Sequence, residues 1–327
     1  MKKLLLASMA LLCSLIGKAD NGFAIDYFTI AANGEVTVNI KMNNDIVFSG
    51  FQFDLELPEG VSMKLNKLNK PIVTATDRLK YVDPDEGIDE THNVQVTQQT
   101  NGLWRIMVYS SSSLDIQGES GGTVLTAKLV ASDQVSTGDF TPQIANIVMS
   151  QANETQYKPD DCSYNCTVTL NTTVTSLGYA SFSWPKALDF TNSGLTAYIA
   201  TSNTNNSLHL ESVTKVPANT GLILKGTAGS ENTYPLQTTE ETTDDVSENM
   251  LTSNTTGTYT VATDNVYVLS NLDNGKPGFY LANQGIHVGQ YKSYLVLSSG
   301  SRQGLVFDEG TTGINGDAIQ EQPADNH

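Results

Sequence analysis

Apolar and polar residues alternate along residues 36–57, VTVNIKMNNDIVFSGFQFDLEL, in two runs separated by a polar turn. The apolar positions are Val36, Val38, Ile40 and Met42 in the first run, and Phe51, Phe53, Leu55 and Leu57 in the second. A period of two puts alternate side chains on opposite sides of a strand, so each run predicts a strand with one buried side. Two such strands favour a β-sandwich with one face in solvent, an architecture typical of binding modules.

The alternation continues to about residue 150. The dipeptide NG at 101–102 is a hairpin turn signal, and it leads into LWRIMVYSSSS. In that segment Trp104 alternates in phase with apolar neighbours and is predicted to lie in the core, whereas Tyr109 points the other way. The segments TVLTAKLVA and FTPQIANIVMS follow as further strands, separated by glycine-containing or polar loops. Short strands at this spacing predict an all-β sandwich.

The second half of the chain also has strand periodicity and no amphipathic helix pattern. Apolar residues are paired two positions apart at Ala197/Ile199, Leu222/Leu224, Val266/Val268 and Leu295/Leu297. Turn residues separate them, among them Pro217 and the segment DNG at 273–275. The acidic, threonine-rich segment 238–249 is predicted to be a surface loop. We therefore expect a second all-β domain.

The first 19 residues are typical of an export signal. Lys2 and Lys3 precede an apolar run over residues 4–16, and small residues at 17 and 19 predict cleavage before Asp20. Cys13 follows two leucines and lacks the small preceding residue that a lipid-modified cysteine requires, so we interpret it as part of the signal. No later apolar run approaches the roughly 18 residues needed to span a bilayer. We expect an extracellular or cell-surface protein without a transmembrane segment.

The chain is strongly acidic, with a formal net charge of −17 that becomes more negative when the three lysines of the signal are removed. Nucleic acids and anionic lipids require clustered Lys and Arg, so the charge argues against nucleic-acid partners. Polysaccharides and proteins remain as partner classes. The acidic residues are scattered along the sequence, and their simplest role is to keep the protein soluble. The oligomeric state is not indicated.

Cys162 and Cys166, in the segment DCSYNC, are the cysteines that remain after signal cleavage. An exported protein meets oxidising conditions, which favours a local disulfide between them. Its stabilising effect would be small because the loop that it closes is short. Two thiols in a turn are the alternative. A metal site would require further ligands, and no histidine lies nearby in the sequence.

Catalytic motifs are missing from the sequence. The four histidines show no metal-binding spacing, and neither a GxSxG elbow nor a phosphate-binding loop is present. Asp54 and Glu56 alternate with the apolar residues of one predicted strand, so we expect both to solvate its outer side and not to form a glycosidase pair. The sequence thus predicts a protein that is not an enzyme and needs no cofactor.

One acidic segment, DPDEGIDE at 83–90, suggests calcium. Asp83, Asp85 and Asp89 supply hard oxygen ligands at alternate positions around a glycine. The EF-hand pattern fails, because Ile88 occupies its glycine position and Val94 its final glutamate position. A solvated acidic loop is the alternative.

Aromatic residues are the candidates for glycan binding, since planar rings stack on the apolar faces of sugars. Tyr109 is predicted to lie on the outer face of its strand. Trp184 precedes Pro185 in a turn-like segment, where its ring is either exposed or buried. We take Tyr109 and Trp184 as the candidate ligand-binding residues.

The ordered set VTVNIKMNNDIVFSGFQFDLELPEGV, WRIMVYSSSSLDIQGESGGTVLTAKLVA and FTPQIANIVMSQANETQ resembles a cohesin domain. This resemblance covers roughly residues 22–170. It implies a nine-stranded jelly-roll sandwich, related to carbohydrate-binding modules, that binds dockerin modules through one sandwich face. The second half, from TVTSLGYASFSWPKALDF onward, resembles a β-rich C-terminal module common in exported surface proteins of Bacteroidota. Such proteins often continue past a TGI-type linker into a sorting domain, which this sequence does not show.

The sequence therefore predicts a signal peptide (1–19), a cohesin-like β-sandwich (20–170), a C-terminal β-rich domain (171–312) and a polar disordered tail (313–327). The expected function is that of a non-catalytic exported binding protein, for carbohydrate or for a dockerin-bearing protein, in extracellular complexes that handle polysaccharide. A cell-surface adhesion or structural protein is the first alternative. A glycan-active enzyme or accessory protein is the second.

Overall fold

The computed structural model describes residues 21–82, 85, 89–204, 206–271, 276–298 and 304–309. The predicted signal (1–19) and tail (313–327) lie outside the described residues. Strands dominate the described part of the chain, whose one helix is the 3-10 turn η1 (Asp77–Leu79). The all-β prediction is therefore confirmed. No helix in these ranges has the length and hydropathy of a membrane-crossing segment.

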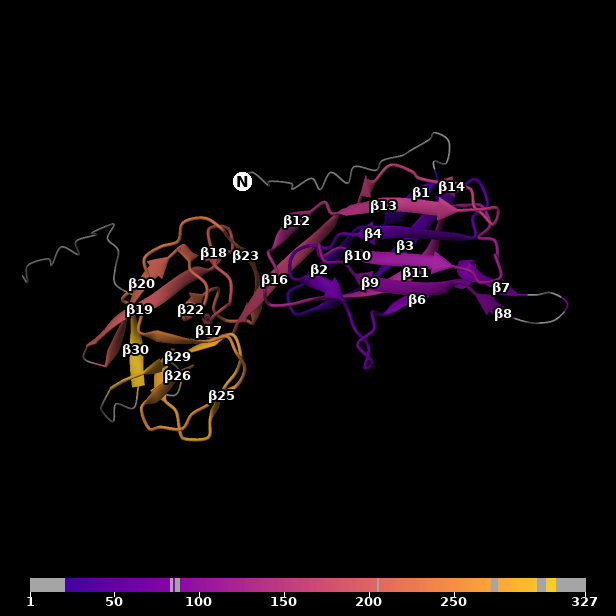
Figure 1. Ribbon diagram of the computed structural model, residues 1–327. Coiled ribbons are helices and arrows are strands. Elements are labelled where there is room, and N and C mark those ends of the chain that lie inside the picture. Colours follow the sequence, from indigo (N-terminus) through magenta and orange to yellow (C-terminus); the bar gives the residue numbers. More distant parts are fainter. Residues whose placement is uncertain are drawn as a thin grey trace, which may run out of the picture. The chain divides into compact units, whose positions relative to one another are not determined.

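The chain forms two compact units (Figure 1). Unit 1 contains the chain up to Phe28, Glu35–Val130 and Phe140–Cys166, and unit 2 contains Thr29–Gly34, Ala131–Asp139 and the chain from Thr167 onward. The boundary expected near residue 170 falls inside strand β16 (Cys166–Val174). Two short segments of the first half belong to unit 2, and one of them is joined to β16 by the hydrogen bond from Ala32 N to Thr169 O (2.7 Å).

Unit 1 is built from two antiparallel sheets. The first sheet has the order β1 (Gly22–Ile25), β3 (Glu35–Asn44), β11 (Glu119–Ala131) and β5 (Val61–Met63), with β6 (Val73–Ala75) also on β11. The second has the order β14 (Gln156–Tyr157), β13 (Gln143–Ser150), β4 (Gly50–Leu55), β10 (Trp104–Tyr109) and β9 (Asn93–Gln98), with β15 (Cys162–Ser163) also on β13. A small hairpin pairs β7 (Lys80–Val82) with β8 (Asp89–Thr91).

The core of unit 1 forms where the predicted apolar faces of these sheets meet. The ring of Phe23 on β1 lies 4.9 Å from that of Phe51 and 4.8 Å from that of Phe53 on β4, measured between centroids. Trp104 and Ile106 on β10 are buried in the same core, so the assignment of Trp104 to the core is confirmed. Strand periodicity thus predicted correctly which side of β4 and β10 is buried.

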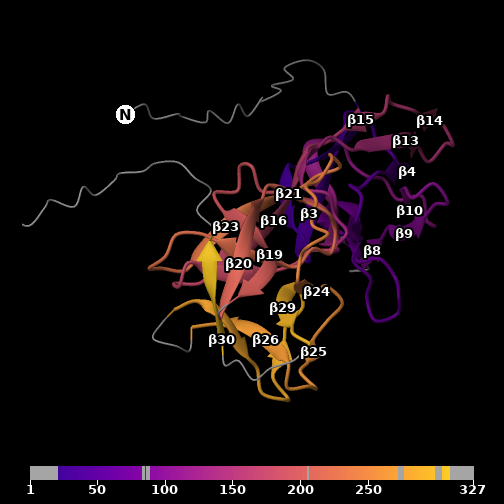
Figure 2. The same ribbon diagram turned by 90° about the vertical axis from the view of Figure 1, so that its left-hand side faces the viewer.

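Unit 2 contains three sheets. The largest has the order β17 (Tyr179–Phe182), β22 (Leu222–Lys225), β19 (Thr196–Thr204), β20 (Ser207–Val213), β30 (Gly304–Glu309), β27 (Gly278–Leu281), β26 (Val266–Ser270), β29 (Lys292–Val296) and β24 (Leu251–Asn254). Another has the order β12 (Gly138–Phe140), β16, β23 (Asn232–Thr238), β18 (Leu188–Asp189) and β21 (Lys215–Val216), with β2 (Phe28–Ala31) on β16. The third pairs β25 (Tyr259–Thr260) with β28 (His287–Val288). Figure 2 shows β30 beside β20, with which it pairs in parallel.

Strand β22, which lies between β17 and β19, is buried on both faces. Leu222 and Leu224 pack in one core cluster, and Ile223 between them packs in another. The period-two pair Leu222/Leu224 correctly marks one buried face. Ile223 marks the second buried face. A strand that is covered on both sides can carry apolar residues at consecutive positions, which explains the run LIL.

Candidate functional site

The outer face of the second sheet of unit 1 carries the side chains that point away from the core. Because Phe51, Phe53 and Val108 point into the core, their strand neighbours Gln52 and Met107 point outward. The register pairs Gln52 with Met107 directly across β4 and β10. We call the outward side chains of β9, β10, β4 and β13 the groove face.

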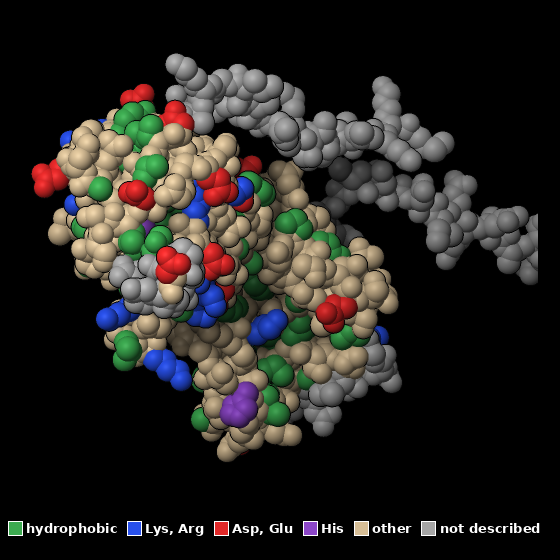
Figure 3. Space-filling model, turned by 90° about the vertical axis from the view of Figure 1, so that its right-hand side faces the viewer, with side chains coloured by type: hydrophobic (Ala, Val, Ile, Leu, Met, Phe, Trp, Pro, Cys, Tyr) green, Lys and Arg blue, Asp and Glu red, His purple; other side chains and the backbone are tan. Residues whose placement is uncertain are grey.

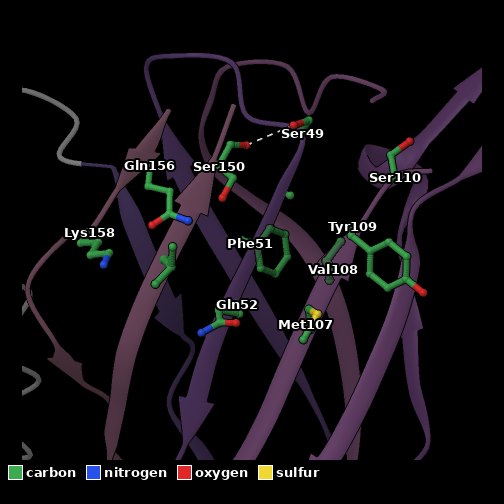
Figure 4. Close-up of a pocket in the computed structure, with 12 residues that line it drawn as sticks. Ser49, Phe51, Gln52, Met107, Val108, Tyr109, Ser110, Ser150, Gln156 and Lys158 are labelled. Carbon is green, nitrogen blue, oxygen red and sulfur yellow. Dashed lines mark hydrogen bonds between the residues drawn. The ribbon is translucent and has the colours of Figure 1, made fainter. Parts of the chain in front are cut away.

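A shallow groove of about 490 Å³ crosses this face. Figure 4 shows Gln156 and Lys158 on one side of it and Tyr109 on the other, with Gln52 and Met107 between them on adjacent strands. Met107 and Val148 on β13 are half-buried and give the groove an apolar floor. At its upper end Ser49 N donates a hydrogen bond to Ser150 O (2.7 Å), and Ser49 Oγ approaches the same oxygen at 3.3 Å.

Tyr109 lies at the rim of the groove, as the alternation predicts. Its side chain is 38% exposed, and its hydroxyl accepts a hydrogen bond from Gln95 Nε2 on β9 (3.1 Å). The hydroxyl is thus held against β9, and Figure 4 shows the ring on the opposite side of the groove from Gln156 and Lys158. This geometry allows a partner to contact the ring without a change in the fold.

A second hollow of about 430 Å³ continues the groove along β13. It shares Gln52, Val148 and Lys158 with the groove, and Arg105 and Asn146 line its far side. The groove face therefore offers one extended concave surface made by strands that are distant in sequence.

A buried carboxylate fixes the far side of this surface. The side chain of Asp54 is 3% exposed and accepts hydrogen bonds from Arg105 Nε and Nη2 and from Asn146 Nδ2, each at 2.8 Å. The bond to Arg105 holds the pKa of Asp54 below its ordinary value, outweighing the opposite effect of burial. The expectation that Asp54 solvates the outer side of its strand is thus wrong. Asn146, at a bulge in β13 with φ of 54°, covers it.

Trp184, the second predicted ligand-binding residue, is buried. Its side chain is 4% exposed and belongs to a core cluster of unit 2. Its ring centroid lies 4.6 Å from that of Tyr291 and 6.3 Å from that of Phe182. A ring enclosed in this way has no face to offer a sugar, so the prediction is wrong for Trp184. The proline that follows it sets a turn in the main chain, while the side chain turns inward.

Cys162 and Cys166 are thiols in the structure, so the predicted disulfide between them is not present. Cys162 belongs to β15 and its Sγ donates to Phe23 O at 3.3 Å, whereas the buried Cys166 begins β16. Membership of different strands directs the two side chains to different surroundings. Burial raises the pKa of the Cys162 thiol, which disfavours the reactive thiolate.

The predicted calcium ligands fall largely outside the described residues. Asp83 is not described, nor is the side chain of Asp89, and Asp85 is exposed. Within the described ranges no group of three or more His, Cys, Asp or Glu side chains is arranged to hold a metal ion. Calcium binding by residues 83–90 therefore remains a prediction.

His92 and the Asp161 carboxylate, both in unit 1, have structural surroundings. Both ring nitrogens of His92 lie near carbonyl oxygens, Nδ1 at 2.9 Å from Leu79 O and Nε2 at 3.1 Å from Leu114 O. Among the described residues that line the groove and its continuation, Asp161 is the single carboxylate. Its Oδ1 accepts a hydrogen bond from Asn146 N (2.9 Å). A glycosidase needs two acids across the sugar, and these lining residues do not supply them.

Acidic side chains are scattered over the molecular face drawn in Figure 3 and do not gather into one patch. Basic side chains stand among them. This distribution agrees with a general solubilising role for the negative charge.

Comparison with known proteins gives no family model that matches the chain and no match among curated proteins. Solved structures do match. CaCohA2 from Clostridium acetobutylicum is 13% identical, with 45% of this chain and 88% of that chain covered and a TM-score of 0.33. A non-cellulosomal cohesin from the archaeon Archaeoglobus fulgidus is 10% identical, with 46% and 91% covered and a TM-score of 0.32. The seventh ScaB type I cohesin from Pseudobacteroides cellulosolvens is 17% identical, with 45% and 90% covered and a TM-score of 0.32.

Proposed function

We propose that this chain is a non-catalytic exported binding protein, and that unit 1 binds a dockerin-type module of another protein on its groove face. The observation that carries the proposal is the concave surface itself, with Met107 and Val148 as its apolar floor and Tyr109 at its rim. The sequence resemblance to cohesins supports the same partner class. Extracellular or cell-surface complexes that handle polysaccharide are the setting that this resemblance implies, and the likeness of the second half to surface proteins of Bacteroidota fits that setting.

The composition of the groove favours a protein over a glycan. Glycan-binding surfaces rely on aromatic platforms, and Tyr109 is the one exposed aromatic ring among the described residues that line the groove. A protein partner is recognised instead by apolar contacts surrounded by polar groups. Gln156 and Lys158 provide such groups at one side of the groove, and Gln52 provides one between Met107 and Val148.

The binding test uses the purified chain against a panel of dockerin modules and a polysaccharide array, each with and without calcium. We expect saturable binding to a dockerin module. The variant Met107→Asp puts a charge into the apolar floor and should weaken that binding at least tenfold. The matched control Thr126→Asp adds the same charge to the outer side of β11, where Thr126 pairs with Asn39, and should leave affinity unchanged.

Three results would contradict the proposal. Binding to one glycan class alone would make unit 1 a carbohydrate-binding module. Binding to neither probe would favour the adhesion or structural role. Equal loss of dockerin affinity in both variants would show that the groove face is not the site.

A further inference from the structure

Strand β9 ends the second sheet of unit 1, and its outer edge is open. β9 pairs with β10, and no other strand in the described ranges pairs with it. Gln99 N donates to Leu103 O (2.8 Å) at the start of the hairpin. The alternation of an antiparallel ladder therefore turns the N–H and C=O groups of Val94 and Val96 away from β10. The strand sequence NVQVTQ has no charge and no proline, the devices with which edge strands prevent pairing with other chains.

A slot lined by both apolar and polar side chains runs along this edge. It has a volume of about 320 Å³ and lies between β9 and the segment Lys70–Val73 that leads into β6. Val73, Val94 and Val96 are only half-buried there, although Ile106, the neighbour of Val96 in the ladder, is fully buried. The valines of β9 thus remain partly in solvent at this edge, where the side chains of an added strand would contact them.

The loop beside the slot is basic. Residues 64–70 read KLNKLNK, with a lysine at every third position. Lys64 pairs with Glu35, whereas Lys67 and Lys70 have no ion pair among the described residues. Asn66 Oδ1 accepts hydrogen bonds from Leu68 N (2.8 Å) and Lys70 N (3.1 Å), which fixes the loop. In this conformation Leu68 is 76% exposed beside the two lysines.

We propose that an extended acidic segment of another protein adds to β9 as an extra strand. Its main chain would bond to the outward groups of Val94 and Val96, its alternate apolar side chains would fill the slot, and its carboxylates would meet Lys67 and Lys70. Addition of a strand takes affinity from the main-chain bonds and specificity from the pockets for alternate side chains. This surface differs from the groove but adjoins it, because Gln95 lines the slot and donates a hydrogen bond to Tyr109 at the groove rim.

Two other occupants fit this surface less well. A second copy of this chain, pairing β9 with β9, would bring an uncharged strand, so the added strand itself would supply no carboxylate to Lys67 or Lys70. An anionic lipid surface could contact the lysines and Leu68, but lipid cannot pair with the open N–H and C=O groups of β9. An extended acidic peptide would pair with the open N–H and C=O groups of β9, place side chains in the slot and supply carboxylates to Lys67 and Lys70.

The test begins with phage-displayed random dodecapeptides selected on the purified chain. We expect the selected peptides to alternate β-branched or aromatic residues with polar ones and to carry acidic residues. The affinity of a selected peptide should fall at least tenfold in Lys70→Glu and in Val96→Lys. Lys128→Glu, which makes the same charge change at an exposed position on β11, should not alter it. Because Lys70 lies on a surface loop, its variant remains informative if Val96→Lys fails to fold.

Amide hydrogen exchange supplies a second readout. Peptide binding should slow exchange at Val94 and Val96 and leave Gln95 and Thr97, which already face β10, unchanged. Failure to select any binding peptide would overturn the proposal, as would equal affinity for the Lys70→Glu and wild-type chains. Concentration-dependent dimers in analytical ultracentrifugation that disappear in Val96→Lys would assign the edge to a second copy. Lys70-dependent binding to phosphatidylglycerol vesicles, without peptide binding, would assign it to a membrane.

Discussion

The outer faces of the two sheets of unit 1 arise from the same alternating pattern, yet they differ in how far their carboxylates are shielded from solvent. On the first sheet, Lys41 pairs with Asp26 (2.7 Å) and Lys64 with Glu35, and the two carboxylates are 52% and 51% exposed while the lysines are 33% and 35% exposed. We call this the charged face. On the groove face, Arg105 and Asn146 cover Asp54. Alternation predicts which side chains leave the core. Contacts from neighbouring strands decide whether those side chains are then solvated or enclosed.

The largest expected difference is the stability of the two kinds of ion pair. Arg105→Ala leaves the Asp54 carboxylate enclosed with Asn146 as its remaining side-chain donor, and an uncompensated buried charge is costly. We expect a loss of about 2 kcal/mol in the unfolding free energy of unit 1, below the value for a fully enclosed pair because Arg105 is 37% exposed. Lys41→Ala on the charged face should cost about 0.5 kcal/mol or less.

Urea unfolding of 5-fluorotryptophan-labelled protein, followed by ¹⁹F NMR, measures both variants. Trp104 lies in unit 1 and Trp184 in unit 2, so the chain's two tryptophans report the units separately. Equal losses of unfolding free energy in Arg105→Ala and Lys41→Ala would mean that the burial of Asp54 does not increase the contribution of its ion pair with Arg105. A change in the Trp184 transition would mean that the effect is not confined to unit 1.

The next effect concerns close packing of backbone on the groove face. A Cβ at Gly50 would lie 2.8 Å from Val108 O on the neighbouring strand, and backbone cannot move aside as a flexible side chain can. Gly50→Ala should therefore destabilise unit 1 by about 1.5 kcal/mol. Gly22→Ala, on the first sheet with no atom within 4 Å of the added Cβ, is the matched control and should be nearly neutral. Similar urea midpoints for the two variants would contradict this prediction.

Much of unit 1 was predictable because each strand has one buried side. The runs over residues 36–57 and 104–109 correctly gave the buried faces of β3, β4 and β10. The same alternation put Tyr109 on the outer side. It did not show that Gln52, Met107, Val148 and Lys158 would line the same groove, because that depends on which strands become neighbours in the sheet.

The errors arose where local sequence does not determine the surroundings of a side chain. Trp184 stands before a proline, a signal for the backbone, but the packing of Phe182 and Tyr291 decides where its ring lies. Asp54 looked solvated because its partner Arg105 is 51 residues away in sequence. Cys162 and Cys166 are close in sequence but lie in different strands. For Trp184 and Asp54, contacts with Tyr291 and Arg105, which are distant in sequence, override the local pattern.

A smaller effect is expected at acid pH, where protonation of Asp54 should lower the unfolding free energy of unit 1. The pKa of Asp54 is lowered in the folded protein, so its contribution is present above the unfolded pKa and is lost as pH falls through the folded pKa. Between pH 5 and pH 2 the wild-type chain should therefore lose on the order of 1 kcal/mol more than Asp54→Asn. The measurement is the unfolding free energy from the Trp104 signal at several pH values. Parallel curves for the two proteins would contradict the prediction.

The smallest effect is expected at the rim of the groove. Tyr109→Phe removes the exposed hydrogen bond with Gln95, and water can satisfy the amide that remains, so the cost should stay below about 0.5 kcal/mol. Tyr157→Phe, on the same sheet and 37% exposed, is the control for removing a surface hydroxyl. A much larger loss for Tyr109→Phe would show that the hydroxyl maintains the fold. Near-equal small losses would mean that the fold does not require the Tyr109 hydroxyl, and reduced dockerin affinity in Tyr109→Phe would then assign that hydroxyl to recognition.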